Sequence, residues 1–371
     1  MDKIYLAPPF QTKYEAQYFS KALASNWLAP NGPFSSQLSK TLTRLSGAKY
    51  VSLTNSGTSA IHLALQLLNI GKGDEVICPT YTFAASLFPV LYQQATPILV
   101  DCDSTTWNID LSLLKTCILD RIKKGKKPKA IIAVHTYGNP IEWKKLTKIA
   151  SKFKIPIIED AAESVGSTYK NKPTGGLGDF GIYSFNANKI VTGSGGGCLL
   201  TDQKKKAKTA ALISQQAKDP ERVFYHHTQT GYNYAMSNIQ AAMIAAQLET
   251  LEKRVSKKKA IFSTYQKKVT SVSFQKECND GFSNRWLTAV QFKKEGTAHK
   301  LNTFMNERQI ETRLSWKPMH MQPIFKPYPS YLNGNAEKLF NSVLCLPSGV
   351  GLSKKEQKHV IESLKIGMDD G

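Results

Sequence analysis

The sequence predicts an α/β protein with a large, mostly parallel sheet domain and a smaller C-terminal α+β domain. Its 371 residues are enough for two domains, and its content of 41% hydrophobic and 21% charged residues is typical of globular proteins. Short apolar runs alternate with helical patterns over residues 49–201, as in a parallel sheet covered on both faces. After about residue 202 this alternation stops, and a long amphipathic helix with weaker strand signals follows.

An N-terminal arm precedes the predicted sheet. Apolar residues at helical spacing predict one helix over residues 14–24 and a second over residues 34–45. The segment between them, residues 25–33, is rich in Asn, Pro and Gly and therefore predicts a rigid turn.

The large sheet is predicted from seven apolar runs rich in β-branched residues. They lie at residues 50–53, 75–78, 97–100, 130–134, 155–158, 180–185 and 198–201. Helical patterns separate several of these runs, at residues 58–69, 82–93, 110–124 and 141–153. Because the runs are short and continuously apolar, we expect helices to cover both faces of a seven-stranded sheet.

The C-terminal part follows another pattern. One long amphipathic helix is predicted over residues 237–269, then a strand at 288–292 and helices at 299–308 and 353–366. We therefore expect residues 1–235 to form the arm and the large domain. Residues 236–371 would form a linking helix and the small domain.

Charge and cysteine content limit the classes of function. The net charge of +21 is concentrated in lysine clusters, and such clusters attract the phosphates of nucleic acids. No nucleic-acid-binding motif accompanies them, so we interpret them as a solvated surface that also suits an anionic small substrate. The six cysteines are scattered without a CxxC pair, which predicts a cytoplasmic protein without disulfides or a metal site. No apolar run is long enough for membrane insertion, and the N-terminus lacks a signal-peptide core.

The segment NSGTSA, residues 55–60, follows a predicted strand and opens a helix. Gly57 would let the backbone approach a ligand, and the free N–H groups at the helix start would bind a phosphate. A turn capped by Thr58 explains the same residues without any ligand.

An aromatic side chain follows the next strand, in the segment PTYTFAAS at residues 79–86. Phe83 or Tyr81 could stack on a flat ring there, although a packing role is the more common one for a single aromatic.

Two later strands end in ionisable groups. Asp160 follows one apolar run and Glu163 comes three residues later, where a carboxylate could keep a heterocyclic nitrogen protonated. Ser184 and Lys189 follow the next run; the hydroxyl could bind a phosphate, and the amine could form a Schiff base with an aldehyde. Alternatively, the two acids could serve only to cap a helix, and the lysine could be an ordinary solvent-exposed residue.

Together, these groups match the needs of one cofactor, pyridoxal 5′-phosphate (PLP). It requires a phosphate clamp, a platform for its ring, an acid for its pyridine nitrogen and a lysine for its aldehyde. All of these lie at the carboxyl ends of successive predicted strands, where ligands bind in open α/β sheets.

The sequence also resembles the DegT/DnrJ/EryC-type sugar aminotransferases, a branch of the fold-type I PLP-dependent aminotransferases. The motifs that carry this resemblance extend over nearly the whole chain; they are NSGTSAIHLAL, PTYTFAAS, VDCD, HTYGNP, IEDAAESVGS, GDFGIYSFNANKIVTGSGGG and GYNYAMSNIQAA. Three later segments, SNRWL, ETRLSWKPMHMQPIF and LPSG, are similar to a narrower branch that contains the bacillosamine-pathway (PglE-like) aminotransferase.

The resemblance implies roles for individual residues. Lys189 would bond the cofactor, and Asp160 would pair with its pyridine nitrogen. Asn233 would reach the phosphate of the neighbouring subunit's cofactor, which implies a homodimer with shared active sites. The other implied cofactor contacts are Gly57, Thr58, Ser59, Phe83, Glu163 and Ser184. Substrate contacts are expected from the branch motifs at Trp27, Asn188, Arg285, Arg313, Trp316 and His320.

The implied reaction moves an amino group from L-glutamate to a nucleotide-linked 4-keto-6-deoxy sugar. The narrower branch points to UDP-2-acetamido-2,6-dideoxy-4-keto-hexose, and GDP-4-keto-6-deoxymannose is the alternative. A non-catalytic basic binding protein on the same fold is an alternative of another class. One departure from the family pattern is Ala235, since the family usually has arginine after the GYNY motif.

Overall fold

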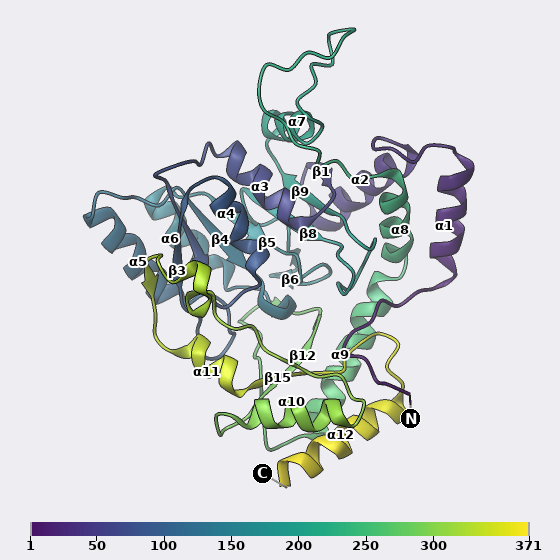
Figure 1. The fold of residues 1–371 in the computed structure, drawn as a ribbon, viewed down its shortest axis with the longest axis vertical. Coiled ribbons are helices and arrows are strands. Elements are labelled where there is room, and N and C mark those ends of the chain that lie inside the picture. Colours follow the sequence, from purple (N-terminus) through teal and green to yellow (C-terminus); the bar gives the residue numbers. More distant parts are fainter. Residues whose placement is uncertain (1, 370–371) are drawn as a thin grey trace.

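The computed structural model describes residues 2–369 and places an eight-stranded sheet in the large domain (Figure 1). Its strand order is β1-β9-β8-β5-β4-β2-β3-β14. Only β9 runs against the others, because it pairs antiparallel with both β1 and β8, so the sheet is mostly parallel as predicted. The strands are β1 (Tyr50–Thr54), β2 (Glu75–Pro79), β3 (Thr96–Val100), β4 (Ala130–Val134), β5 (Ile157–Asp160), β8 (Phe180–Ser184), β9 (Gly197–Thr201) and β14 (Ser330–Tyr331).

The eighth strand differs from the sequence prediction of seven. Strand β14 comes from the C-terminal part of the chain and pairs in parallel with β3 at the edge of the large sheet. Leu99 and Asp101 donate their backbone N–H groups to Pro329 and Tyr331, each over 2.9 Å. A strand of two residues has no periodic pattern in the sequence, because alternation needs about four residues to be visible.

Helices cover both faces of the large sheet, which accounts for the continuously apolar strands. Every side chain of β2 and β4 is buried. The covering helices are α3 (Gly57–Leu67), α4 (Phe88–Tyr92), α5 (Leu111–Lys123), α6 (Trp143–Phe153) and α7 (Lys204–Ile213). The N-terminal arm forms α1 (Lys13–Ala24) and α2 (Pro33–Ser46), both of which pack beside α8 (Asn238–Leu248) (Figure 1).

Two predicted helices are interrupted in the structure. The helix expected over residues 237–269 is α8 followed by α9 (Leu251–Lys268), and the break falls at Thr250. Thr250 leaves the helical conformation, and its hydroxyl donates to the Gln247 carbonyl over 3.2 Å, a side-chain bond that competes with helix continuation. The helix expected over residues 82–93 is a short 3₁₀ turn (Ala84–Ser86) followed by α4, because Pro89 has no N–H group to continue the ladder.

The smaller C-terminal unit is built on a four-stranded antiparallel sheet of order β10-β12-β15-β13. The strands are β10 (Ser273–Phe274), β12 (Thr288–Gln291), β13 (Arg313–Leu314) and β15 (Val343–Leu346). Helices α10 (Thr297–Glu307), α11 (Asn335–Ser342) and α12 (Lys354–Asp369) accompany this sheet. A third small sheet, of order β11-β6-β7, joins Gly281–Phe282 to Thr168–Tyr169 and Lys172–Pro173. Among residues 2–369, no helix is both long and apolar enough to cross a membrane.

Candidate active site

A cavity of about 500 Å³ opens where the carboxyl ends of the central strands meet the smaller sheet. Strand β5 ends in Asp160, and the segment after β8 supplies Lys189. Residues of the smaller unit, among them Trp286 and Trp316, close the other side. The arrangement brings together ten of the residues predicted from the sequence, namely Gly57, Thr58, Phe83, Asp160, Glu163, Ser184, Asn188, Lys189, Arg313 and Trp316.

The N-terminus of α3 forms one end of the cavity. Ser56 caps this helix by accepting the Ser59 N–H over 3.0 Å, so the cap is Ser56 and not Thr58. A Cβ on Gly57 would lie 2.9 Å from the Ser184 Cβ, which shows how closely the helix start approaches the end of β8. The positive end of the helix dipole and free N–H groups therefore face the cavity beside two hydroxyls, an arrangement that binds phosphate.

Ser59, a predicted phosphate contact, does not line the cavity. Its hydroxyl lies 2.8 Å from the Ser56 hydroxyl and donates to Asn55 Oδ1 over 2.7 Å. Asn55 itself lines the cavity, so Ser59 orients a cavity residue.

Asp160 is held rigidly at the end of β5. Its Oδ2 accepts the Ser86 hydroxyl over 2.6 Å, and its Oδ1 accepts the Ala162 N–H over 3.2 Å. The side chain is 96% buried, since only 4% of the residue is exposed. A buried carboxylate that retains both acceptors in this way is suited to stabilise a positive charge placed against it.

Lys189 and Glu163 form a pair in the centre of the cavity. The Lys189 Nζ lies 3.3 Å from Glu163 Oε1, and Glu163 Oε2 accepts the Tyr137 N–H over 2.9 Å. Burial raises the pKa of Glu163 to about 7, although the neighbouring Lys189 ammonium opposes this shift. Lys189 also lies over the ring of Trp286, 4.2 Å from its centroid. This lysine is therefore largely desolvated and contacts both an acid and an aromatic ring.

Aromatic side chains line much of the remaining wall. Phe83 stands at the cavity with 59% of its surface exposed, which leaves its ring free to stack on a ligand. On the opposite side Trp316 packs on Tyr137, with ring centroids 4.5 Å apart. Arg313 is exposed, donates to Glu311 Oε1 over 3.2 Å and supplies a cation at the cavity edge.

Besides Ser59, four more predicted site residues lie outside this cavity. Trp27 is half exposed and donates to the Pro30 carbonyl over 2.9 Å. Arg285 pairs with Glu277 at 3.1 Å, and His320 lies between the Thr80 hydroxyl at 2.7 Å and Glu337 at 3.1 Å. Asn233 accepts the Gln216 side-chain amide over 2.9 Å and also lies outside the cavity of its own chain.

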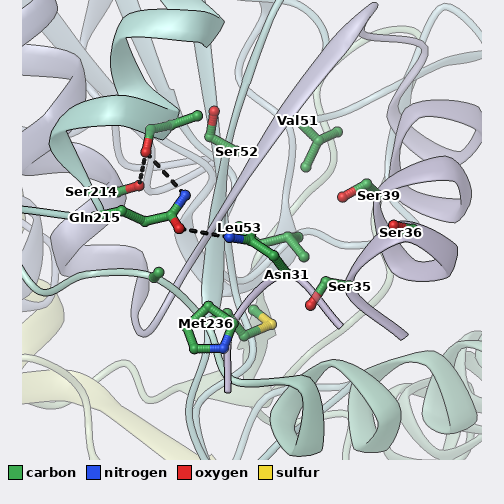
Figure 2. Close-up of a pocket in the computed structure, with 13 residues that line it drawn as sticks. Asn31, Ser35, Ser36, Ser39, Val51, Ser52, Leu53, Ser214, Gln215 and Met236 are labelled. Carbon is green, nitrogen blue, oxygen red and sulfur yellow. Dashed lines mark hydrogen bonds between the residues drawn. The ribbon is translucent and has the colours of Figure 1, made fainter. Parts of the chain in front are cut away.

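Ala235 lines a second, separate cavity of about 270 Å³ (Figure 2). Ser35, Ser36 and Ser39 lie on one side of it and Gln215 on the other, where Gln215 Oε1 accepts the Asn31 amide over 2.7 Å (Figure 2). The departure from the family pattern at residue 235 therefore lies at this second cavity, and Ala235 does not line the cavity of Lys189 in its own chain.

Sequence reasoning missed several residues of the first cavity. Ser86 and Tyr137 lie within the motifs PTYTFAAS and HTYGNP and line the cavity. Their positions within these motifs follow no sequence pattern that marks a hydroxyl or an aromatic as a site residue. Tyr137 has a left-handed backbone, with φ of 54°, which directs its N–H at Glu163. Trp286 comes from the smaller unit, and only the folded structure brings its ring to Lys189.

The donor set and shape of this cavity fit PLP. The close approach of Gly57 to Ser184 leaves a cradle at a helix start for a phosphate. Asp160, Phe83 and Lys189 then provide an acid, a ring platform and an amine within the same cavity.

Comparisons with known proteins agree with this chemistry. A model of the DegT/DnrJ/EryC1/StrS aminotransferase family matches residues 9–365. EpsN of Bacillus subtilis strain 168, whose name describes a pyridoxal phosphate-dependent aminotransferase, is 40% identical over 98% of this chain and 95% of its own. A GDP-perosamine synthase of Escherichia coli O157:H7 is 33% identical over 98% of both chains. The crystal structure of a DegT DnrJ EryC1 StrS aminotransferase from Brucella abortus superposes with a TM-score of 0.90 at 27% identity, covering 95% of this chain and 94% of the other.

These matches confirm the predicted fold class, enzyme class and cofactor. The chain belongs to the DegT/DnrJ/EryC1/StrS aminotransferase family and is a PLP-dependent sugar aminotransferase.

Proposed function

We propose that this enzyme transfers an amino group from L-glutamate to the C4 keto group of a nucleotide-linked 4-keto-6-deoxy sugar. The observation that carries the proposal is the joint placement of Lys189 and Asp160 in one cavity beside the start of α3. The second alternative predicted from the sequence, a non-catalytic basic binder, is not favoured, because the chain belongs to an aminotransferase family.

We assign the cofactor contacts as follows. Thr58 and Ser184 bind the phosphate together with the N–H groups of the α3 start, and Gly57 allows the close approach. Phe83 would support the ring, and the Asp160 carboxylate would stabilise a protonated pyridine nitrogen. When bound, PLP supplies the electron sink that makes the Cα proton of an amino acid acidic.

Lys189 is the residue that moves the proton. As a general base, its Nζ would take the proton from the Cα of the amino donor, and as a general acid it would then give that proton back. Glu163, 3.3 Å from this Nζ, orients the amine. Trp286, Trp316 and Tyr137 shield this end of the cavity from water.

For the acceptor, our first candidate is UDP-2-acetamido-2,6-dideoxy-4-keto-hexose, because the segments 283–287, 311–325 and 346–349 resemble the bacillosamine-pathway branch. The second candidate is GDP-4-keto-6-deoxymannose, which is favoured by the 33% identity to a GDP-perosamine synthase. Arg313 at the cavity edge suits the anionic diphosphate that both candidates contain. Trp316 and Asn188 line the same cavity and complete the proposed sugar contacts; Trp27, Arg285 and His320 do not reach it within one chain.

A homodimer with shared sites is part of this proposal. Asn233 lies outside its own cavity, where it forms an antiparallel β-bridge with Gln215. The segment between these two residues projects beyond α7 (Figure 1). The tip of this segment exposes Val223, Phe224 and Tyr225, whose exposed fractions are 103%, 61% and 81%. An exposed apolar tip on a projecting segment favours contact with another protein surface, here a second copy of the chain.

The proposed division of the chain keeps residues 1–235 as arm and PLP domain and residues 236–371 as linking helix and small domain. We also place the reaction in the cytoplasm, because the six cysteines are free thiols and five of them are buried.

The direct test is turnover with a small panel of UDP-, GDP- and dTDP-linked 4-keto-6-deoxy sugars in the presence of L-glutamate. We expect a 4-amino sugar nucleotide and an equal amount of 2-oxoglutarate from the UDP-linked sugar, and none from the Lys189→Ala variant. Turnover of the GDP-linked sugar alone would select the second candidate, and turnover of none would contradict the proposal.

A further inference from the structure

Lys258 is a buried lysine behind the cavity of the proposed active site. It lies on α9 with only 3% of its surface exposed. Its Nζ donates to the Trp286 carbonyl over 2.8 Å and to the Ser348 carbonyl over 2.9 Å. Among the described residues, no carboxylate forms an ion pair with it. A lysine buried in this way is rare, because desolvation of the ammonium is costly and is usually offset by a carboxylate.

The Trp286 carbonyl connects Lys258 to the proposed catalytic lysine. The indole Nε1 of Trp286 donates to the Asn188 carbonyl over 2.8 Å, and the face of the ring lies 4.2 Å from Lys189 Nζ. Lys189 and Lys258 also line one narrow crevice, together with Phe10. A short chain of contacts therefore runs from α9 through Trp286 to Lys189.

We propose that Lys258 is a positioning residue that fixes the Trp286 ring against Lys189 by anchoring the Trp286 backbone. Segment 283–287 lies outside the helices and strands, so its conformation depends on such local bonds. The ring in turn favours a protonated Lys189 Nζ, because the face of an indole attracts a cation. This inference rests on the proposed role of Lys189 and extends it to a residue that touches neither substrate nor cofactor.

The pKa of Lys258 is consistent with an anchoring role and not with an ion pair. Burial, together with the nearby Arg254 guanidinium, lowers the pKa of Lys258 to about 7. The charged and titratable groups around Lys189 are Tyr137, Asp160, Glu163, Arg313 and Cys345 in the cavity and Arg254 and Lys258 behind it.

The test measures how readily Lys189 loses its proton, without using catalytic turnover. Cofactor-free protein is mixed with PLP at a series of pH values, and the rate at which the visible absorption band appears gives the apparent pKa of Lys189. Lys258→Met is compared with Lys253→Met, the same change at an exposed position of α9. Both changes are repeated in a Trp286→Leu background, which lacks the indole.

We expect Lys258→Met to lower the apparent pKa of Lys189 by about half a unit to one unit, the size expected from a lost cation–π contact. Lys253→Met should leave the value unchanged. If Lys258 acted only through its positive charge, its removal would raise the apparent pKa of Lys189. The direction of the pKa change therefore distinguishes a positioning role from a purely electrostatic one. In the Trp286→Leu background, Lys258→Met should lose its lowering effect.

Equal shifts with and without the indole, or no fall relative to Lys253→Met, would overturn the proposal. If Lys258→Met does not fold, Lys258→Arg serves in its place, because its forked head group keeps the charge but cannot occupy the position of the amine on both carbonyls. A visible band that forms equally in Lys189→Ala would instead contradict the proposed function, so the two failures are distinguishable.

Discussion

We propose separate tasks for Asp160 and Lys189, and the surroundings of each residue suit it to its own. Asp160 accepts hydrogen bonds from the Ser86 hydroxyl and the Ala162 backbone, whereas Lys189 is placed between the Glu163 carboxyl and an indole ring. The acid is thus fixed in place, and the amine has neighbours that control its proton.

Asp160→Asn should separate cofactor binding from catalysis. The amide keeps the shape of the side chain but removes the negative charge that stabilises a protonated pyridine nitrogen. We expect PLP to bind within about tenfold of its normal affinity and kcat to fall by roughly 100-fold or more. Spectrophotometric titration and steady-state kinetics measure the two effects, and an unchanged kcat would argue against the assigned role.

The raised pKa of Glu163 predicts that the stability of the protein depends on pH. Its pKa in the folded protein is about 7, against an ordinary value of 4.5, so the folded state binds more protons between these values. Stability of the cofactor-free protein should therefore fall as the pH rises through this window. Glu163→Gln should remove about 1 kcal/mol or more of this fall.

Thermal unfolding at about pH 5 and about pH 8 checks this sign, with Glu252→Gln on the exposed side of α9 as the matched control. The same pH dependence in Glu163→Gln and in the unaltered protein would show that another group is responsible.

At the scale of elements, the start of α3 and the end of β8 form one unit. A Cβ at Gly57 would lie 2.9 Å from the Ser184 Cβ, so Gly57→Ala should push these elements apart and weaken PLP binding by about ten- to 100-fold. Gly71→Ala is the control, because no atom lies within 4 Å of the Cβ that it would add. Equal PLP affinity in both variants would contradict the proposal that the close approach of α3 and β8 forms the phosphate site.

The sequence predicted most elements, and its failures have local causes. Short apolar runs identified the seven long strands of the large sheet because burial on both faces leaves a continuous apolar pattern. The sequence-based prediction missed β14, because this strand has only two residues. It also predicted α8 and α9 as one helix, because the break at Thr250 is not marked by a Pro or Gly.

The site could be predicted only where chemistry coincided with a motif. Lys189, Asp160 and Ser184 follow recognisable strands, so their convergence at one edge of the sheet could be predicted. Trp286 could not, because its place against Lys189 depends on how the smaller sheet packs over the cavity.

At the scale of the whole molecule, the proposed dimer makes each site depend on two chains. Lys189→Ala should be inactive, and Asn233→Ala should have reduced activity because the partner's cofactor loses a phosphate contact. After the two variants are mixed and allowed to exchange subunits, a hybrid dimer contains one site with both native residues. Activity should then rise well above that of either variant alone; a simple average of the two would contradict shared sites.

The central claim is that Lys189 bonds the cofactor. Reduction of the PLP-loaded enzyme with borohydride, followed by proteolysis and mass spectrometry of the peptides, tests it most directly, because reduction makes the bond permanent. We expect the phosphopyridoxyl label on the peptide that contains Lys189 and its absence from Lys189→Ala. A label on another lysine of the native enzyme, or the same labelling in Lys189→Ala, would contradict the account.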